Sequence, residues 1–135
     1  MAKFVATDYK VTINGGTVSS SLASVELPIE IDEQETTAFG SSWRTRIAGL
    51  KSGSITLEFH QDFAAGAIDA ILWPLLGTNA TVTVTPTSGT VNASNPSFTG
   101  TFLVTSYTPF ASTTGDLATS SITWPLTGEL TRATA

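Results

Sequence analysis

The chain has 135 residues, enough for one domain with a substantial hydrophobic core. It contains no cysteine, which excludes disulfide bonds and cysteine-ligated zinc sites. Its net charge of −5, with only six lysines and arginines, argues against tight non-specific binding of nucleic acid, which needs clustered cations.

The composition suits a β-rich protein whose surface is partly covered by neighbours. Charged residues make up 13% of the chain, about half the usual quarter, so serine and threonine must cover much of the surface. The first eight residues lack the apolar stretch of a secretory signal. No apolar run approaches the roughly 18 residues of a membrane span. We therefore expect a soluble protein that is made in the cytoplasm and has no membrane partner.

The first predicted elements are two strands. Residues 9–13 alternate and end at the turn signal Asn14-Gly15-Gly16. Residues 22–32 place apolar side chains at odd positions, and the carboxylates Glu26 and Glu30 at even ones. This period of two predicts strands with one buried and one solvated face.

A long insertion follows, which we predict as a loop over 33–48. Loops beyond about 12–15 residues are uncommon in compact domains and are usually functional or disordered. This one contains Phe39, Trp43, Arg44 and Arg46, which a solvated linker would not need. An interface role for Trp43 is favoured over local packing. We predict that the insertion contacts a molecule outside its own subunit.

The second half of the chain predicts one helix among further strands. Residues 54–62 alternate, and residues 64–76 place apolar side chains on one helical face, with Asp62 as N-cap, Pro74 ending the regular pattern and Gly77 as the stop. Further strands are predicted over 80–86, 98–108 and 118–128. This order predicts a mainly β fold, an antiparallel sandwich or barrel with one short flanking helix. We expect residues 1–135 to form a single domain.

Four of the predicted strands, 22–32, 54–62, 98–108 and 118–128, share a division into an apolar face and a polar face. If they lie side by side, their polar faces form one mildly acidic surface, which would repel a polyanion rather than bind it. The members of this surface would be Glu26, Glu30, Thr56, Glu58, His60, Thr99, Thr101, Thr105, Thr119, Ser121, Thr123 and Thr127.

No enzymatic site is predicted. The single histidine, His60, stands between Glu58 and Asp62 in the sequence, but a zinc or acid–base site would need more ligands or a nucleophile motif. The carboxylates Asp32, Glu33 and Glu35 lack the spacing of a calcium loop and are interpreted as loop charges that repel or pair with a neighbour. Neither a metal nor a cofactor is expected. The large aromatic residues Trp73, Phe102 and Trp124 are assigned to the core.

Several short phrases, taken in order, resemble one protein family. They are Glu-Thr-Thr-Ala-Phe-Gly-Ser, Gly-Leu-Lys-Ser-Gly-Ser-Ile-Thr and Gly-Asp-Leu-Ala-Thr-Ser. Over about residues 20–130 the chain resembles the major tail, or tail tube, proteins of long non-contractile-tailed bacteriophages. The resemblance implies rings of six subunits, stacked into a hollow tube through which DNA passes without specific binding. It also implies a tape-measure protein and a tail terminator as partners, a place in the virion tail and assembly in the host cytoplasm.

The resemblance also implies roles for parts of the chain. The four long strands would join a continuous inner barrel with their polar residues facing the lumen, although Pro28 interrupts the first of them, so its pairing should shift or bulge. The loop would contact the next ring, and its arginines would pair with carboxylates of a neighbour. The residues assigned to this contact are Asp32, Glu33, Glu35, Phe39, Trp43, Arg44 and Arg46.

Residues 1–20, an N-terminal arm with the first strand, and those after Arg132 match no motif of the family and are expected to be inter-subunit arms. Two alternatives remain at this point. One is a tail terminator or neck protein that forms a single ring. The other is a free-standing β-sandwich module that decorates a capsid or binds a carbohydrate.

Overall fold

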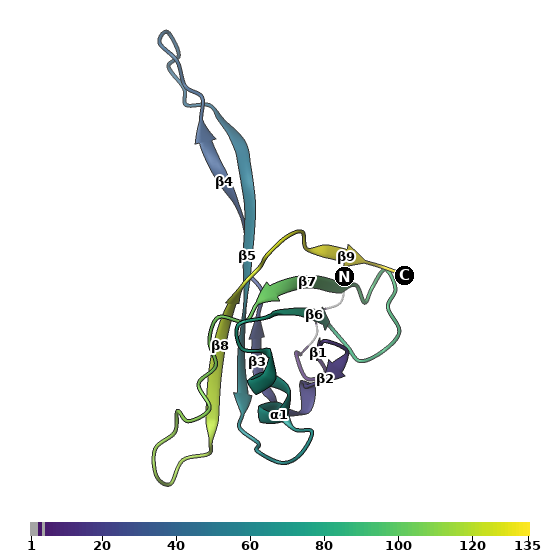
Figure 1. Cartoon of the computed structure of the whole chain (residues 1–135). Coiled ribbons are helices and arrows are strands. Elements are labelled where there is room, and N and C mark those ends of the chain that lie inside the picture. Colours follow the sequence, from purple (N-terminus) through teal and green to yellow (C-terminus); the bar gives the residue numbers. More distant parts are fainter. Residues whose placement is uncertain (1–2, 4) are drawn as a thin grey trace.

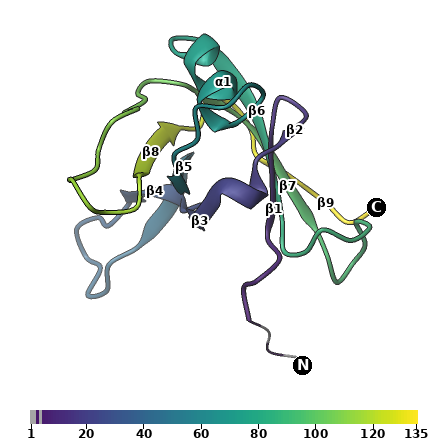
Figure 2. The ribbon, with the colours of Figure 1, turned by 90° about the horizontal axis from the view of Figure 1, so that it is seen from below.

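Alternating strands assemble into two antiparallel sheets that face each other (Figures 1 and 2) in a computed structural model describing residues 3 and 5–135. The five-stranded sheet has the order β2-β1-β6-β7-β9. Its strands are β1 Lys10–Ile13, β2 Gly16–Thr17, β6 Asn79–Thr85, β7 Ser97–Leu103 and β9 Thr131–Ala133. The other sheet is built on β5, and its strands are β3 Leu22–Glu26, β4 Ile29–Glu35, β5 Arg46–His60 and β8 Thr119–Pro125. The predicted antiparallel β fold is confirmed as an open sandwich rather than a closed barrel.

The core lies between the two sheets because each strand turns its apolar positions inward. Ile55, Leu57 and Phe59 of β5 are buried, as are Ile122 and Trp124 of the neighbouring strand β8. Burial of each such aliphatic or aromatic side chain contributes about 1.5–3 kcal/mol. The Trp124 indole N–H donates a 3.0 Å hydrogen bond to the carbonyl of Ser106. The core assignment is therefore confirmed for Trp124 and also for Phe102, which is 1% exposed, whereas Trp73 is 62% exposed and its core assignment is wrong.

The helical segment is shorter than the predicted 64–76. It consists of α1 Ile68–Leu72 and the 3-10 turn η2 Trp73–Leu75, and a further 3-10 turn, η1 Ser19–Ser21, precedes β3. Residues 62–67 form turns instead, because the Asp62 carboxylate accepts the N–H of Ala64 and Gly66 has a positive φ of 77°. Asp62 is thus a turn residue, and Ala67 is the N-cap. The predicted end is confirmed, since η2 contains Pro74 and is followed by Gly77 with a φ of 83°.

The first predicted turn is confirmed, and Pro28 interrupts its strand as expected. Asn14 and Gly15 both have positive φ and join β1 to β2. Pro28 lies between β3 and β4, which pair with different stretches of the same strand, β5. The Pro28 carbonyl accepts the N–H of Ser54 at 3.2 Å. The chain therefore changes pairing at Pro28 while keeping one continuous partner strand.

The four predicted strands with polar faces do not all lie side by side. Strands from 22–32, 54–62 and 118–128 share the β5 sheet, but 98–108 contributes β7, which pairs with β6 and β9 in the other sheet. The physical reason is that β6 and β7 follow each other closely in the chain and form an antiparallel hairpin, the common arrangement of sequential strands. The predicted four-strand surface is therefore reduced to three strands.

Candidate functional site

The predicted loop over 33–48 is for the most part a β-hairpin. β4 pairs with the first half of β5 from Ile29↔Gly53 to Glu35↔Arg46, and residues 36–45 form its tip. The hairpin extends well beyond the sandwich (Figure 1), and every residue of β4 is exposed. The outer part of this strand pair is exposed and is therefore available for contact with another molecule.

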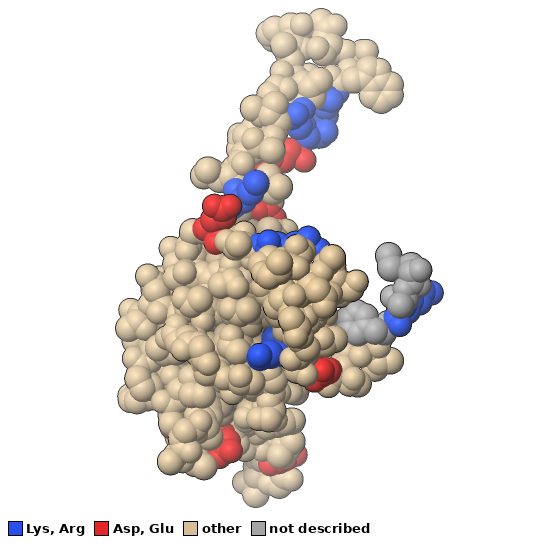
Figure 3. Space-filling model, turned by 90° about the vertical axis from the view of Figure 1, so that its right-hand side faces the viewer, with Lys and Arg blue, Asp and Glu red and all other residues tan. Residues whose placement is uncertain are grey.

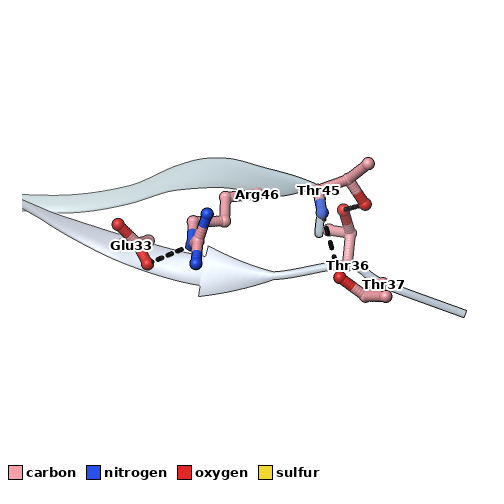
Figure 4. A network of polar contacts seen from close by, with 5 residues as sticks. All are labelled: Glu33, Thr36, Thr37, Thr45 and Arg46. Carbon is pink, nitrogen blue, oxygen red and sulfur yellow. Dashed lines mark hydrogen bonds and ion pairs between the residues drawn. The ribbon is translucent and has the colours of Figure 1, made fainter. Parts of the chain in front are cut away.

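A set of polar contacts holds the base of the tip in place (Figure 4). The Nε atom of Arg46 lies 2.5 Å from Oε1 of Glu33. The hydroxyls of Thr36 and Thr45 are hydrogen-bonded at 2.7 Å, and the Thr45 N–H donates to the Thr37 hydroxyl at 2.9 Å. Exposed contacts of this kind contribute about 0–1 kcal/mol each. They orient the tip more than they stabilise the fold.

The two arginines differ in their surroundings. Arg46 pairs with Glu33 of its own chain, so this carboxylate is already engaged within the subunit. Within residues 3 and 5–135, Arg44 forms no ion pair. The pairing of either arginine with a carboxylate of a neighbour stays a prediction.

Aromatic side chains at the tip point into solvent. Phe39 is fully exposed and Trp43 is 84% exposed, so local packing of Trp43 within the subunit is excluded. The stem adds Ile31, Ile47 and Leu50, which are 52%, 60% and 81% exposed. Aromatic residues are enriched at the centres of protein interfaces, and Trp is among the types that most often carry the affinity there.

One polar face runs across β3, β5 and β8 and includes one residue at the start of β4. Glu26 pairs with Thr56 and Thr56 pairs with Thr123, and the two threonine hydroxyls are hydrogen-bonded at 3.1 Å. Paired residues of antiparallel strands lie on the same side of a sheet. The polar face is therefore formed by Glu26, Thr56, Glu58, His60, Thr119, Ser121 and Thr123, together with Glu30, whose partner Ser52 has the same parity on β5 as Thr56. These eight positions include three carboxylates and neither lysine nor arginine.

The remaining predicted members of that surface lie elsewhere. Thr99 and Thr101 pair with Thr83 and Thr81 in the five-stranded sheet. Thr105 follows the end of β7, and Thr127 follows the end of β8. The N–H of Thr127 donates to the carbonyl of Thr101 at 2.8 Å, so this part of the chain joins the other sheet.

The polar face ends at two unpaired strand edges. β3 and β8 pair with opposite edges of β5. In the part of the chain that the structure describes, no strand pairs with the second edge of either one. Open edges present unpaired N–H and C=O groups, with which a further strand can pair.

Sequence reasoning missed an apolar cluster at the end of the sandwich opposite the hairpin. The rings of Phe63 and Phe110 are stacked, with centroids 5.4 Å apart. They are 53% and 80% exposed, and Leu117 nearby in the chain is 68% exposed. The available signal was the presence of Phe110 and Leu117 in a segment otherwise rich in serine, threonine and glycine.

Hydrogen bonds fix the loop that carries Phe110. The Tyr107 hydroxyl donates to the Asp69 carboxylate at 2.5 Å, and the Gln61 amide donates to the Pro109 carbonyl at 2.8 Å. The pKa of Tyr107 is raised to about 12, mainly because the side chain is partly buried and also because its hydroxyl is hydrogen-bonded to Asp69. The Ser120 hydroxyl also donates to the carbonyl of Thr108. The loop is therefore held against α1, β5 and β8.

Neither a cluster of metal-binding side chains nor a membrane-spanning helix is found in the part of the chain that the structure describes. Among residues 3 and 5–135, no group of three or more His, Asp or Glu side chains is placed to hold a metal ion. No helix in the described residues is long and apolar enough to cross a bilayer. His60, on the polar face, lies beside no second histidine, since the chain has one.

The fold is shared with two chains of solved particle structures. One, from the virion of a native gene transfer agent particle, superposes with a TM-score of 0.75 at 18% sequence identity, covering 93% of this chain and 95% of that one. The other, from the tail of an empty gene transfer agent particle with C6 symmetry, gives a TM-score of 0.70 at 21% identity, covering 94% of both chains. No protein-family model and no curated protein sequence matches the chain. At these identities the likeness establishes the fold, and it extends over almost the whole chain.

Proposed function

We propose that the chain is a structural, non-enzymatic virion protein that assembles as stacked six-membered rings into a phage-like tail tube for DNA delivery. The observation that carries the proposal is the near full-length likeness to a chain in a C6-symmetric particle tail. A hairpin that projects from the body and two open sheet edges support it, because they offer contacts in two directions.

Within a ring, the open edges supply the lateral contact. β3 of one copy would pair with β8 of the next, so that the β5 sheets join into a continuous barrel. Closure of this kind removes exposed edges, which otherwise cause uncontrolled aggregation. This closure would use both open edges of the β5 sheet that the isolated subunit leaves unpaired.

The polar face would line the bore. Each copy then contributes Glu26, Glu30 and Glu58 among threonines and serines, without a lysine or arginine. Screening confines the repulsion of DNA to within about 8 Å of the wall at physiological salt. Such a lining discourages adhesion of phosphates without blocking passage. Thr99, Thr101, Thr105 and Thr127 are not part of this lining in our proposal.

Between rings, the hairpin supplies the axial contact. Its tip and stem expose Phe39, Trp43 and Leu50, which burial against the next ring would remove from water. Assembly in the host cytoplasm around a tape-measure protein, with a terminator closing the tube, is part of the same proposal.

Electron microscopy of the purified protein tests the proposal. Tubes of stacked six-membered rings are expected, with or without the other tail proteins. Isolated rings would favour a terminator or neck protein instead. A monomer at high concentration would favour a decoration or adhesion module, and either result would overturn the tube assignment.

A further inference from the structure

Two exposed apolar surfaces lie at opposite ends of the molecule. One is the hairpin tip, residues 36–45, with Phe39 and Trp43. The other, here called the far-end cluster, consists of Phe63, Phe110 and Leu117, together with the exposed Asp116 that precedes Leu117, in the loops at the other end (Figure 1). β5 runs from Arg46 at the tip to His60 at the far end, about 46 Å at 3.3 Å per residue. The two surfaces therefore cannot meet within one copy.

The far-end cluster is preformed. Phe63 and Phe110 come from different loops and stack on each other at 5.4 Å. The Asp116 N–H donates to the carbonyl of Thr113, and the Ser112 hydroxyl accepts the N–H of Thr119 at 2.9 Å. A fixed apolar surface costs little ordering entropy when a partner binds.

The charges of the two surfaces are complementary. Arg44 is the one charged residue in the sequence of the tip, and its guanidinium forms no ion pair with the described residues. The sequence contains no lysine or arginine between Lys51 and Arg132, so the far-end loops carry only the acids Asp62 and Asp116. Figure 3 shows both basic and acidic residues along the hairpin stem and acidic residues at the opposite end of the body.

We infer that the far-end cluster is the receptor for the hairpin tip of a second copy of this chain. Phe39 and Trp43 pack on Phe63, Phe110 and Leu117, and Arg44 pairs with Asp116. The contact joins two different surfaces, and a contact of that type propagates as an open stack with one polarity. The inference rests on the proposed tube and names the surface that receives the hairpin.

Charge reversal tests the pairing. Arg44→Asp and Asp116→Arg should each raise the protein concentration needed for tube formation by roughly tenfold or more, because each places like charges together. The double variant Arg44→Asp/Asp116→Arg should restore assembly. Glu129→Arg, a reversal at an exposed site away from both surfaces, should assemble like the wild type.

Cysteine cross-linking gives a second, independent measurement, because the natural chain has no cysteine. Ser42→Cys combined with Ala111→Cys, at exposed positions next to Trp43 and Phe110 that leave both aromatic side chains in place, should yield a ladder of covalent oligomers when assembled protein is oxidised. Ser42→Cys combined with Thr81→Cys, on the outer side of the five-stranded sheet, should yield none.

The outcomes separate this inference from the proposed function. Normal tube formation by both single reversal variants would overturn the inference and leave the proposed tube intact. The same conclusion would follow if the double variant failed to restore assembly and no covalent ladder appeared. Single rings or monomers from the wild type would overturn both.

Discussion

Gly49 faces Asp32 across the hairpin in a close approach that leaves little room for a side chain. A Cβ atom at position 49 would lie 3.1 Å from the Cβ of Asp32 and 3.2 Å from its carbonyl oxygen. The pairing register shifts at this point, between Ile31 and Glu33. A bulge in an antiparallel pair bends the strands and increases their twist. The close approach of Gly49 and Asp32 therefore sets the direction in which the outer half of the hairpin projects.

Substitution of Gly49 should misdirect the hairpin without unfolding the subunit. Gly49→Val forces the strands apart at the bulge, with a local cost of about 1–3 kcal/mol, while the core between the sheets is untouched. We expect a melting temperature close to that of the wild type and loss of tubes in electron micrographs. Gly89→Val, where the nearest atom is a side-chain oxygen at 3.5 Å, serves as the control. Normal tubes from Gly49→Val would contradict the role given to the bulge.

Replacement of the tip should separate folding from assembly. A variant in which residues 37–44 are replaced by Asn-Gly keeps the stem and closes it with a favoured two-residue turn. It removes Phe39, Trp43 and Arg44, none of which contributes to the core. Circular dichroism should show a folded β protein, and light scattering should show no tubes. Tubes of normal length from this variant would show that the tip is not an assembly contact.

Tyr107 should contribute stability that depends on pH at the alkaline end. Its pKa is raised to about 12 from the ordinary tyrosine value of 10, so its proton is held more tightly in the folded protein. The contribution is complete below pH 10 and is lost as the pH rises through about 12. Tyr107→Phe removes the hydrogen bond to a carboxylate and should cost about 1–3 kcal/mol at neutral pH.

Urea unfolding of the wild type and of Tyr107→Phe at neutral and alkaline pH measures this contribution. The difference in unfolding free energy between the two proteins should shrink toward zero above the folded pKa. The chain has two tyrosines, so ultraviolet absorbance of tyrosinate in Tyr9→Phe reports the titration of Tyr107 alone. A difference that stays constant through this range would show that Tyr107 is not the titrating group.

Lysines on the polar face should make the tube retain DNA. The combined change Glu26→Lys, Glu30→Lys and Glu58→Lys should leave the fold intact, because the three side chains are exposed in the subunit. Each lysine offers a phosphate contact, so assembled tubes should bind DNA at low salt and release it as salt rises. The matched control carries Thr81→Lys, Thr90→Lys and Ala93→Lys, at exposed positions outside the polar face.

Passage and retention can be measured as DNA ejection from reconstituted particles and as filter binding to tubes. Slower ejection is expected for the glutamate variant only. Equal DNA binding by the glutamate variant and the control would mean that net charge, and not a lumenal position, governs the effect.

The buried faces of the strands, the first tight turn and the strand interruption could be predicted, because each depends on residues that are close together in the sequence. The alternation around Ile55 and Trp124 specifies which face of each strand is buried, and Asn14-Gly15 specifies a tight turn through its positive φ angles. Pro28 removes a backbone donor, so the interruption of its strand could also be foreseen.

Long-range features could not be predicted in the same way. The residues around Thr99 do not indicate that β7 pairs with β6 rather than with β5. Pairing in either sheet would bury the apolar face of β7 equally well. The residues of the hairpin read as a loop because they lack a buried face, and it is this missing burial that weakens the strand pattern. The stack of Phe63 on Phe110 joins segments that are far apart in sequence, so only the folded chain reveals it.

The central claim is that copies of this chain join laterally through β3 and β8 and axially through the hairpin to form a tube. A cryo-electron microscopy reconstruction of the assembled wild-type protein tests it most directly. The account predicts C6-symmetric stacked rings, with Glu26, Glu30 and Glu58 facing the bore and each hairpin reaching the next ring. A tube with these glutamates on its outer surface, or hairpins that contact only their own ring, would contradict it.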